Sequence, residues 1–315
     1  MHRNRLNGKS QTGRTVPHLR LFVQVISTAL FNGYVIGFAE GKIFTGATKA
    51  LCVPVLNCYS CPGALGACPI GALQAVIGGT KHSVSFYVIG SMMLFGTVFG
   101  RLICGFMCPF GLVQDLLYKV PLKKIHISER IDRPARYLKY LVALVLVVVL
   151  PTVLTNDFGM ASPYFCKFLC PAGTLGGGIP LLVSNESIRA TIGLLFGWKF
   201  FLLVAILVAS ILISRPFCKY LCPLGAFYSL FSRFSLFQMR LDQSKCVGCR
   251  RCVRVCIMDI DPTKSMGGPE CIRCGGCASV CPAKAIASGF EFGAHVGTKP
   301  RATTSGHENK EGDVL

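Results

Sequence analysis

The cysteines are the residues whose type and spacing best support chemistry in this sequence. Of the 315 residues, 18 are cysteine, and eight of these form two C-x2-C-x2-C-x3-C runs. Three cysteines two residues apart let one tight loop reach three corners of an iron–sulfur cube, while the fourth turns away to a second cube. The spacing therefore predicts two [4Fe–4S] clusters with crossed ligands. We expect the first to be held by Cys246, Cys249, Cys252 and Cys281, and the second by Cys271, Cys274, Cys277 and Cys256.

A zinc site is the main alternative for these runs, because zinc also takes four ligands, commonly as two cysteine pairs. Eight cysteines in two four-member runs favour clusters instead. Residues 242–289 resemble the bacterial two-cluster ferredoxins, which implies a small α+β domain. Ile257 stands where those ferredoxins usually have a proline after the first run. This difference affects the local backbone and leaves all eight ligands in place.

Four Cys-Pro-x-Gly motifs precede this segment, at Cys68, Cys108, Cys170 and Cys222. Proline is favoured at the first position of a helix, so each of these cysteines is predicted to lie at a helix N-terminus. The helix dipole there favours an anion and lowers the pKa of a thiol. Such a position suits a thiolate that holds a negatively charged cluster.

The sequence before residue 242 is an approximate duplication, over about 16–124 and 136–236. The segment from Arg101 to Cys108-Pro-Phe-Gly matches the segment from Arg215 to Cys222-Pro-Leu-Gly. Internal repeats often place a site at their shared interface. Two-fold packing would therefore form a possible inner cluster site from Cys104, Cys108, Cys218 and Cys222. At the other face, Cys166 and Cys170 would meet two of Cys58, Cys61 and Cys68.

Two other interpretations of these ten cysteines, which also include Cys52, stay open. They are buried free thiols beside helix-capping turns, or disulfides on an oxidising face of a membrane. A separate motif, Thr45-Gly-Ala-Thr48, resembles the short sequence at which some membrane redox subunits attach FMN. Four common residues match easily by chance, so covalent FMN at Thr48 is not expected.

Composition indicates that much of the chain lies in lipid. It is 52% hydrophobic and only 15% charged, against about a quarter charged in soluble domains. Four apolar runs, 21–39, 84–100, 137–154 and 192–213, predict four transmembrane helices. The net charge of +19 does not indicate nucleic-acid binding, because the basic residues flank these runs. Lys139 and Lys199 lie inside apolar runs, and we expect them to extend to the interface.

Loop charge and composition give the predicted organisation. A basic N-terminus (1–20) precedes a membrane domain (21–241), the ferredoxin-like domain (242–289) and a disordered tail (290–315). Basic residues before the first run and between the second and third place both termini and the ferredoxin-like domain in the cytoplasm. A basic surface on that domain would either dock an acidic redox partner or remain a solvated face that balances the cluster charge, and its members are Arg250, Arg251, Arg254 and Arg273.

Over residues 16–289 this arrangement resembles the NapH-type membrane polyferredoxins, with related membrane parts in NosR-like and CcoG-like proteins. The resemblance implies electron transfer at a bacterial cytoplasmic membrane, between quinol or another membrane donor and a partner oxidoreductase. We therefore expect an electron-transfer subunit with no catalytic residues. A CcoG-like metal reductase or maturation factor, or a thiol-based redox regulator, is the alternative. Cys-Pro loops at both faces and the additional Cys52, Cys58 and Cys61 depart from the simplest family pattern.

Overall fold

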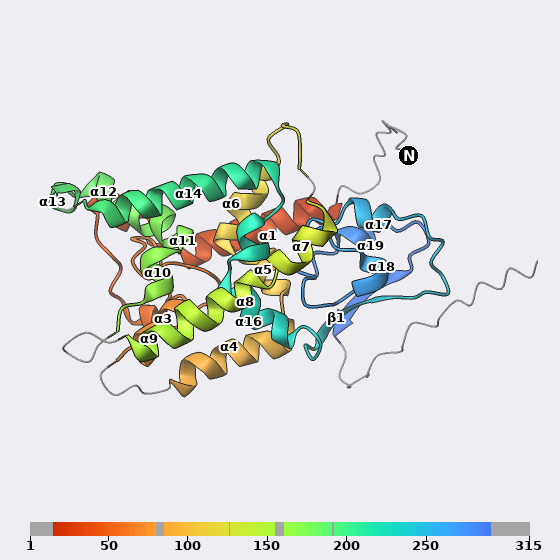
Figure 1. The fold of residues 1–315 in the computed structure, drawn as a ribbon, viewed down its shortest axis with the longest axis horizontal. Coiled ribbons are helices and arrows are strands. Elements are labelled where there is room, and N and C mark those ends of the chain that lie inside the picture. Colours follow the sequence, from red (N-terminus) through yellow and green to blue (C-terminus); the bar gives the residue numbers. More distant parts are fainter. Residues whose placement is uncertain (1–14, 80–84, 126, 155–160, 191, 291–315) are drawn as a thin grey trace, which may run out of the picture.

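The computed structural model describes residues 15–79, 85–125, 127–154, 161–190 and 192–290, with side chains from residue 18 onward. The predicted tail, 290–315, lies outside the described residues apart from Phe290, as does most of the predicted basic N-terminus. The described chain forms an elongated helical part and a smaller C-terminal part at one end of it (Figure 1).

The first apolar run does not form the single helix predicted over 21–39. Helix α1 (Thr15–Phe31) ends at Phe31, and α2 (Ile36–Glu40) follows after a short break. Asn32 and Gly33 lie at the break, where such residues favour the end of a helix. Two backbone hydrogen bonds fix the break against a distant loop, because Leu65 N–H donates to Phe31 O (2.9 Å) and Tyr34 N–H donates to Gly63 O (3.2 Å).

The other three runs are helical. Helix α4 (Phe86–Phe99) covers the second. The third run lies in a longer helical segment that begins before it. This segment consists of α7 (Glu129–Ala135), α8 (Leu138–Val142), the wider turns of η2 (Ala143–Val149) and α9 (Leu150–Val153). The fourth is α14 (Leu194–Leu212). Among the described residues, two helices have the length and apolar composition to cross a membrane, Glu129–Val153 and Leu194–Leu212, while His18–Phe31 and Phe86–Phe99 are shorter.

Short helices follow the Cys-Pro motifs at both ends of the helical part. As predicted, a proline opens α3 (Pro69–Ile77), α6 (Pro109–Tyr118), α11 (Pro171–Gly173) and α16 (Pro223–Phe231), and the cysteine before each is in extended conformation. Helices α5 (Leu102–Phe106) and α15 (Pro216–Tyr220) precede α6 and α16. The remaining short elements are η1 (Ala47–Ala50), α10 (Tyr164–Phe168), η3 (Thr174–Gly178), α12 (Ile179–Ser184) and α13 (Glu186–Ala190).

The C-terminal part is a small α+β unit. Strand β1 (Phe237–Leu241) pairs antiparallel with β2 (Ile286–Phe290), with Phe237 opposite Phe290 and Leu241 opposite Ile286. Between them lie α17 (Arg251–Arg254), α18 (Pro262–Ser265) and α19 (Gly276–Ser279). The unit thus begins at its first strand, before the predicted boundary at residue 242.

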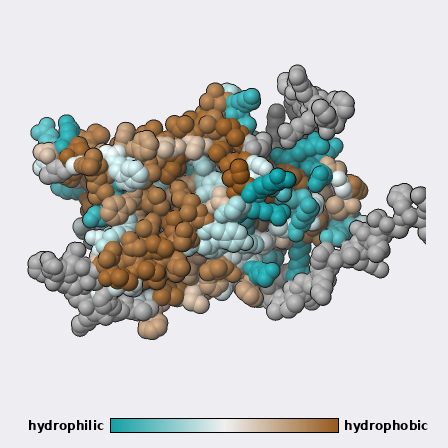
Figure 2. All heavy atoms as spheres, viewed as in Figure 1, coloured by the Kyte–Doolittle hydropathy of each residue, from teal (hydrophilic) through white to brown (hydrophobic). Residues whose placement is uncertain are grey.

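On the face shown in Figure 2, apolar side chains form most of the surface of the helical part, and hydrophilic residues gather on the C-terminal unit. Phe86 is 85% exposed, Leu194 is 93% exposed and Phe201 is 63% exposed. Soluble monomers rarely expose apolar surface on this scale, and such surface marks contact with lipid or another protein. The exposed apolar surface of the helical part suits contact with a membrane.

Candidate functional site

The two cysteine runs of the C-terminal unit fold into loops with the same backbone. Gly248 and Arg250 flank Cys249 with φ of 66° and 55°, and Arg273 and Gly275 flank the equivalent Cys274 with φ of 54° and 75°. Left-handed residues on both sides of the middle cysteine curl each loop tightly. Each of the two arginines bears a strain of about 1–2 kcal/mol in this conformation, which glycine does not.

The second predicted ligand set lines a single cavity, together with apolar side chains such as Met258 and Ile272. Its cysteines are Cys256, Cys271, Cys274 and Cys277. Burial and the neighbouring thiols raise the pKa of Cys277 to about 12, and burial raises the pKa of Cys256 to about 11. Crowded thiolates in an apolar cavity need positive charge among them, which the iron of a cluster provides. The donor set therefore fits a [4Fe–4S] cluster.

The first predicted set lies at the more exposed end of the unit. Cys249 is exposed, while Cys246, Cys252 and Cys281 are partly buried. The thiols of Cys246 and Cys252 interact electrostatically. Cys281 follows α19, which packs against α17, and its Sγ accepts a hydrogen bond from Ala285 N–H (3.4 Å). Cys256, which follows α17, lies with the second run.

The predicted inner set comes together where α5, α6, α15 and α16 meet. Cys108, Cys218 and Cys222 are buried, and Cys104 is half-buried. The Cys108 thiol interacts electrostatically with Cys104 and Cys218, and the Cys222 thiol interacts with all three others. Two cysteines from each half therefore form one group of four.

Two fully buried arginines join the halves around this inner set. Arg101, from the first half, donates from Nη2 to the carbonyl of Cys218 (3.3 Å). Arg215, from the second half, donates from Nη1 to the carbonyl of Cys104 (2.8 Å). Both side chains are 0% exposed. A cubane with four thiolates carries a net charge of about −2 when oxidised, so two buried guanidinium groups suit it well.

The carboxylates that pair with these arginines come from different parts of the chain. Asp115, on α6, accepts from Arg215 Nε (2.8 Å) and Nη2 (2.6 Å), and from Arg20 Nη2 (2.5 Å). Burial opposes ionisation of Asp115, but Arg215 and Arg20 outweigh it and lower its pKa. The position equivalent to Asp115 in the second half is Ser229, seven residues after its Cys-Pro cysteine. The second half therefore lacks a carboxylate of its own there.

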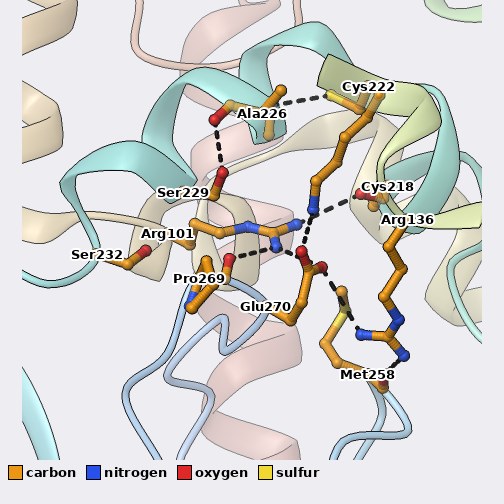
Figure 3. Close-up of polar contacts among 12 residues, drawn as sticks. Arg101, Arg136, Cys218, Cys222, Ala226, Ser229, Ser232, Met258, Pro269 and Glu270 are labelled. Atoms are coloured by element: carbon orange, nitrogen blue, oxygen red, sulfur yellow. Dashed lines mark hydrogen bonds and ion pairs between the residues drawn. The ribbon is translucent and has the colours of Figure 1, made fainter. Parts of the chain in front are cut away.

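Glu270, directly before Cys271, supplies the missing carboxylate to Arg101. Arg101 Nη1 lies 3.0 Å from Glu270 Oε2, Lys139 Nζ lies 2.5 Å from Oε1, and Arg136 Nη1 lies 3.7 Å from Oε2. Figure 3 shows Glu270 between Arg101 and Arg136. Burial alone would raise its pKa, but Arg101 and Lys139 hold the pKa of Glu270 below its ordinary value.

Further contacts fix the C-terminal unit on the helical part. Arg136 Nη2 donates to Met258 O (2.8 Å), and Ser214 Oγ donates to Ile257 O (2.5 Å). A Cβ placed on Gly105, next to Cys104, would lie 2.8 Å from Ile272 O. Since Ile272 follows Cys271, the second ferredoxin loop touches the helix that carries Cys104. The second and inner cysteine sets are therefore neighbours.

Two expectations about basic residues are wrong. Arg273 is not on an exposed docking surface; it is buried and donates to Phe99 O (2.9 Å) and Ser232 O (2.5 Å) of the helical part. Lys139 does not extend to the interface, because it is 0% exposed and is paired with Glu270. Each side chain is held by a partner across the boundary between the helical part and the C-terminal unit. The pattern of apolar residues along the sequence does not indicate such a partner. Arg250, Arg251 and Arg254 are exposed as expected.

At the far end of the helical part, four of the five cysteines considered for the outer set come together. The thiol of Cys170 interacts electrostatically with Cys58, Cys68 and Cys166. Cys61 differs, because its Sγ donates to Asn32 Oδ1 (3.6 Å) and its main thiol neighbour is Cys58. Cys52 belongs to neither set: no thiol is among the groups that act on it, and its backbone forms an isolated bridge with Ala67, the residue before Cys68.

Two glutamines that bond these cysteines were not anticipated. Gln114 Nε2 donates to Cys218 Sγ (3.2 Å), and its Oε1 accepts from Phe217 N–H (3.2 Å). Gln74 contacts Cys166 and Phe165 in the same way. Both glutamines are buried and stand six residues after a Cys-Pro cysteine. Comparison of the two Cys-Pro-x-Gly-x-x-Gln segments would have found them.

All eighteen cysteines lie in the described part of the chain, and none forms a disulfide there. Among the described residues, no three His, Cys, Asp or Glu side chains are close enough to share a single metal ion. The thiolates of a cubane attach to four separate corners, so they are spaced more widely than ligands of one ion.

Comparison with known families finds iron–sulfur domains over the segments that carry these cysteines. A family model described as a 4Fe-4S binding domain matches residues 83–128, 140–185 and 195–241. Each matched segment contains one Cys-x3-Cys-Pro motif, so the repeating unit is one helix and one loop. A second model, a 4Fe-4S dicluster domain, matches residues 238–282. No solved structure matches the chain.

Several curated proteins resemble most of the chain. Two uncharacterised proteins of Methanocaldococcus jannaschii are 33% and 31% identical over 59% and 62% of this chain, and the matches span 63% and 74% of their lengths. The ferredoxin-type protein NapH of Haemophilus influenzae is 26% identical over 64% of this chain and 67% of its own length.

These similarities define an iron–sulfur protein of electron transport that binds [4Fe–4S] clusters. The chain belongs to the NapH-type family of ferredoxin-like membrane proteins.

Proposed function

We propose that this chain conducts electrons between a membrane donor or acceptor, such as quinol, and a partner oxidoreductase. The route would pass through two clusters in the ferredoxin-like unit and a third in the inner set. The ligands would be Cys246, Cys249, Cys252 and Cys281 for the first cluster, Cys271, Cys274, Cys277 and Cys256 for the second, and Cys104, Cys108, Cys218 and Cys222 for the inner one.

The observation that carries this proposal is the contact between the second and inner cysteine sets. Arg101 binds the carbonyl of Cys218 and the carboxylate of Glu270 with the same guanidinium group. Cys218 belongs to the inner set, and Glu270 precedes a cysteine of the second set. The Arg101 side chain therefore fixes the separation of the two cysteine sets. A helical part that served only to anchor a soluble domain would not need a fixed separation.

When bound, [4Fe–4S] clusters supply reversible one-electron oxidation and reduction. The residues of the chain hold, space and shield them. Arg101 and Arg215 would balance the negative charge of the inner group in an environment without water. Gln114 donates a hydrogen bond to Cys218 Sγ, and hydrogen bonds to ligand sulfurs tune cluster potentials.

The same proposal includes a topology. Four helical segments, α1 with α2, α4, Glu129–Val153 and α14, would cross a bacterial cytoplasmic membrane, with both termini and the ferredoxin-like unit inside. The basic residues of the α6–α7 connection lie toward that unit and follow the positive-inside pattern. The break after α1 is tolerated because the backbone it meets, including Pro62 to Ala64, is buried in protein.

A redox partner would dock at the end of the unit that faces away from the membrane. Cys249 is exposed there, and so are Arg250, Arg251 and Arg254. Complementary charge speeds encounter between redox proteins. An acidic surface on an oxidoreductase subunit suits this group of three arginines.

Iron and sulfide analysis of the anaerobically purified full chain tests the inner site. We expect more than the roughly eight iron that two cubanes hold. A Cys104→Ala/Cys218→Ala variant should lose about four iron and four sulfide and keep the ferredoxin EPR signals. A Cys52→Ala variant is the control, since Cys52 lies outside both sets and should not change the counts. A wild-type count of eight, unchanged in the double variant, would refute the inner cluster.

A further inference from the structure

We propose that the outer end of the helical part holds a fourth four-thiolate iron–sulfur site, formed by Cys58, Cys68, Cys166 and Cys170, with Cys61 excluded. This rests on the proposed function and extends it to the far side of the membrane. The route would then have one site near each face of the bilayer.

The outer group is built on the same plan as the inner one. Gln74 Nε2 donates to Cys166 Sγ (3.6 Å), and its Oε1 accepts from Phe165 N–H (3.0 Å). Gln114 makes the same pair of contacts with Cys218 and Phe217 at the inner group. In both places a glutamine of one half holds a cysteine of the other half, through its thiol and the preceding peptide.

Space is also left between the outer thiols, where two glycines lie. A Cβ placed on Gly173 would lie 3.6 Å from Cys58 Sγ and 3.8 Å from Cys170 Sγ. A Cβ placed on Gly71 would lie 3.9 Å from Cys166 Sγ. Both glycines come from Cys-Pro-x-Gly motifs. The glycines thus keep the region between the sulfurs free of side-chain atoms, as a bulky inorganic group requires.

Positively charged side chains also lie near the outer thiols. Cys68 and Cys170 are buried, so thiolates there need nearby cations. Lys199 interacts electrostatically with Cys166, and the buried Lys49 interacts with Cys61 and, less strongly, with Cys58. Lys49 is held in place by donating from Nζ to Ala64 O (2.7 Å). Two lysines at the outer group correspond in number to the two arginines at the inner one.

The outer cysteines also lie close to the inner group. The backbone N–H of Leu56 interacts with the Cys108 thiol, and the next N–H, of Asn57, interacts with the Cys68 thiol. Two consecutive peptide groups of one loop therefore lie against a cysteine of each group. Buried Tyr228 also interacts electrostatically with both groups, with Cys68 of the outer one and with Cys104, Cys108 and Cys222 of the inner one. The outer group is thus placed to exchange electrons with the inner one.

The test is iron and sulfide content of the anaerobically purified full chain, with Mössbauer spectra of 57Fe-enriched protein. Four cubanes correspond to about sixteen iron per chain. A Cys58→Ala variant should lose about four iron and four sulfide. The matched control is Cys61→Ala, in the same loop, which should keep the wild-type content. The ferredoxin EPR signals report that each variant is folded.

A Gly173→Ala variant gives a second test that removes no ligand. The new methyl group makes ordinary contacts with the protein, at 3.6 and 3.8 Å from two sulfurs, but it occupies the space between them. We expect it to lose the same four iron. Wild-type iron content in both Cys58→Ala and Gly173→Ala would overturn the outer site. If the Cys104→Ala/Cys218→Ala variant still loses iron in that case, the proposed inner route stands without it.

Discussion

Replacement of Glu270 by glutamine should loosen the ferredoxin-like unit from the helical part. The change keeps the size of the side chain and removes its charge. Glu270 faces Arg101 Nη1 at 3.0 Å and Lys139 Nζ at 2.5 Å, and both cations are 0% exposed. Neither can reach water in the docked state, so the substitution leaves two buried positive charges without their carboxylate.

Removing one partner of a buried ion pair costs about 3–5 kcal/mol. Every 1.4 kcal/mol is a factor of ten in an equilibrium constant, so 3 kcal/mol corresponds to about a hundredfold. The opening of the interface should therefore become about a hundredfold more frequent. Hydrogen–deuterium exchange of amides at the interface, such as Leu236 N–H bonded to Thr97 O (2.8 Å), measures this opening.

A matched control is Glu129→Gln, because Glu129 pairs with Arg133 at 3.7 Å and both side chains are more than three-quarters exposed. Exposed pairs contribute only about 0–1 kcal/mol, so exchange at the interface should stay at the wild-type rate. If Glu270→Gln accelerates exchange no more than this control, the buried network does not hold the unit in place, and the reasoning is wrong.

Two further predictions concern stability. Asp115→Asn leaves buried Arg215 without its carboxylate, so the melting temperature should fall by several degrees. The control is Glu40→Gln, at an exposed pair with Lys42, which should not change the melting temperature. Equal shifts in the two variants would contradict this account. Gly100→Ala should destabilise the chain, because Gly100 has φ of 55° and its Cβ would lie 2.3 Å from Arg273 Nη1. Gly197→Ala, in α14 with nothing within 4 Å, should be neutral or stabilising by up to about 1 kcal/mol, and thermal unfolding compares the two.

The sequence predicted the features that depend on local spacing. The cysteine runs, the prolines that open four short helices and the pairing of Cys104 with Cys218 all follow from motifs or from their repetition. The break after Phe31 was missed, because uniform apolar composition hides the hydrogen bonds that a distant loop makes to the backbone.

Features that depend on contacts between distant segments could not be predicted in this way. Hydropathy describes Lys139 only by its neighbours in sequence, and its partner Glu270 is 131 residues away. The choice of Cys58 over Cys61 for the outer group depends on where Asn32 lies, since Asn32 accepts the bond from Cys61. Repetition alone would have indicated Gln74 and Gln114, and an alignment of the two halves against each other would have been enough.

The origin of Glu270 outside the helical part has a consequence for how the molecule is made. Chains are synthesised from the N-terminus, so Arg101 and Lys139 are in place long before residue 270 leaves the ribosome. Arg215 differs, because Asp115 precedes it in the chain. The carboxylate for Arg215 is thus available as the helices assemble, and the one for Arg101 only when the later C-terminal unit folds against them. The ferredoxin-like unit therefore completes the charge pairing of the helical part rather than merely being attached to it.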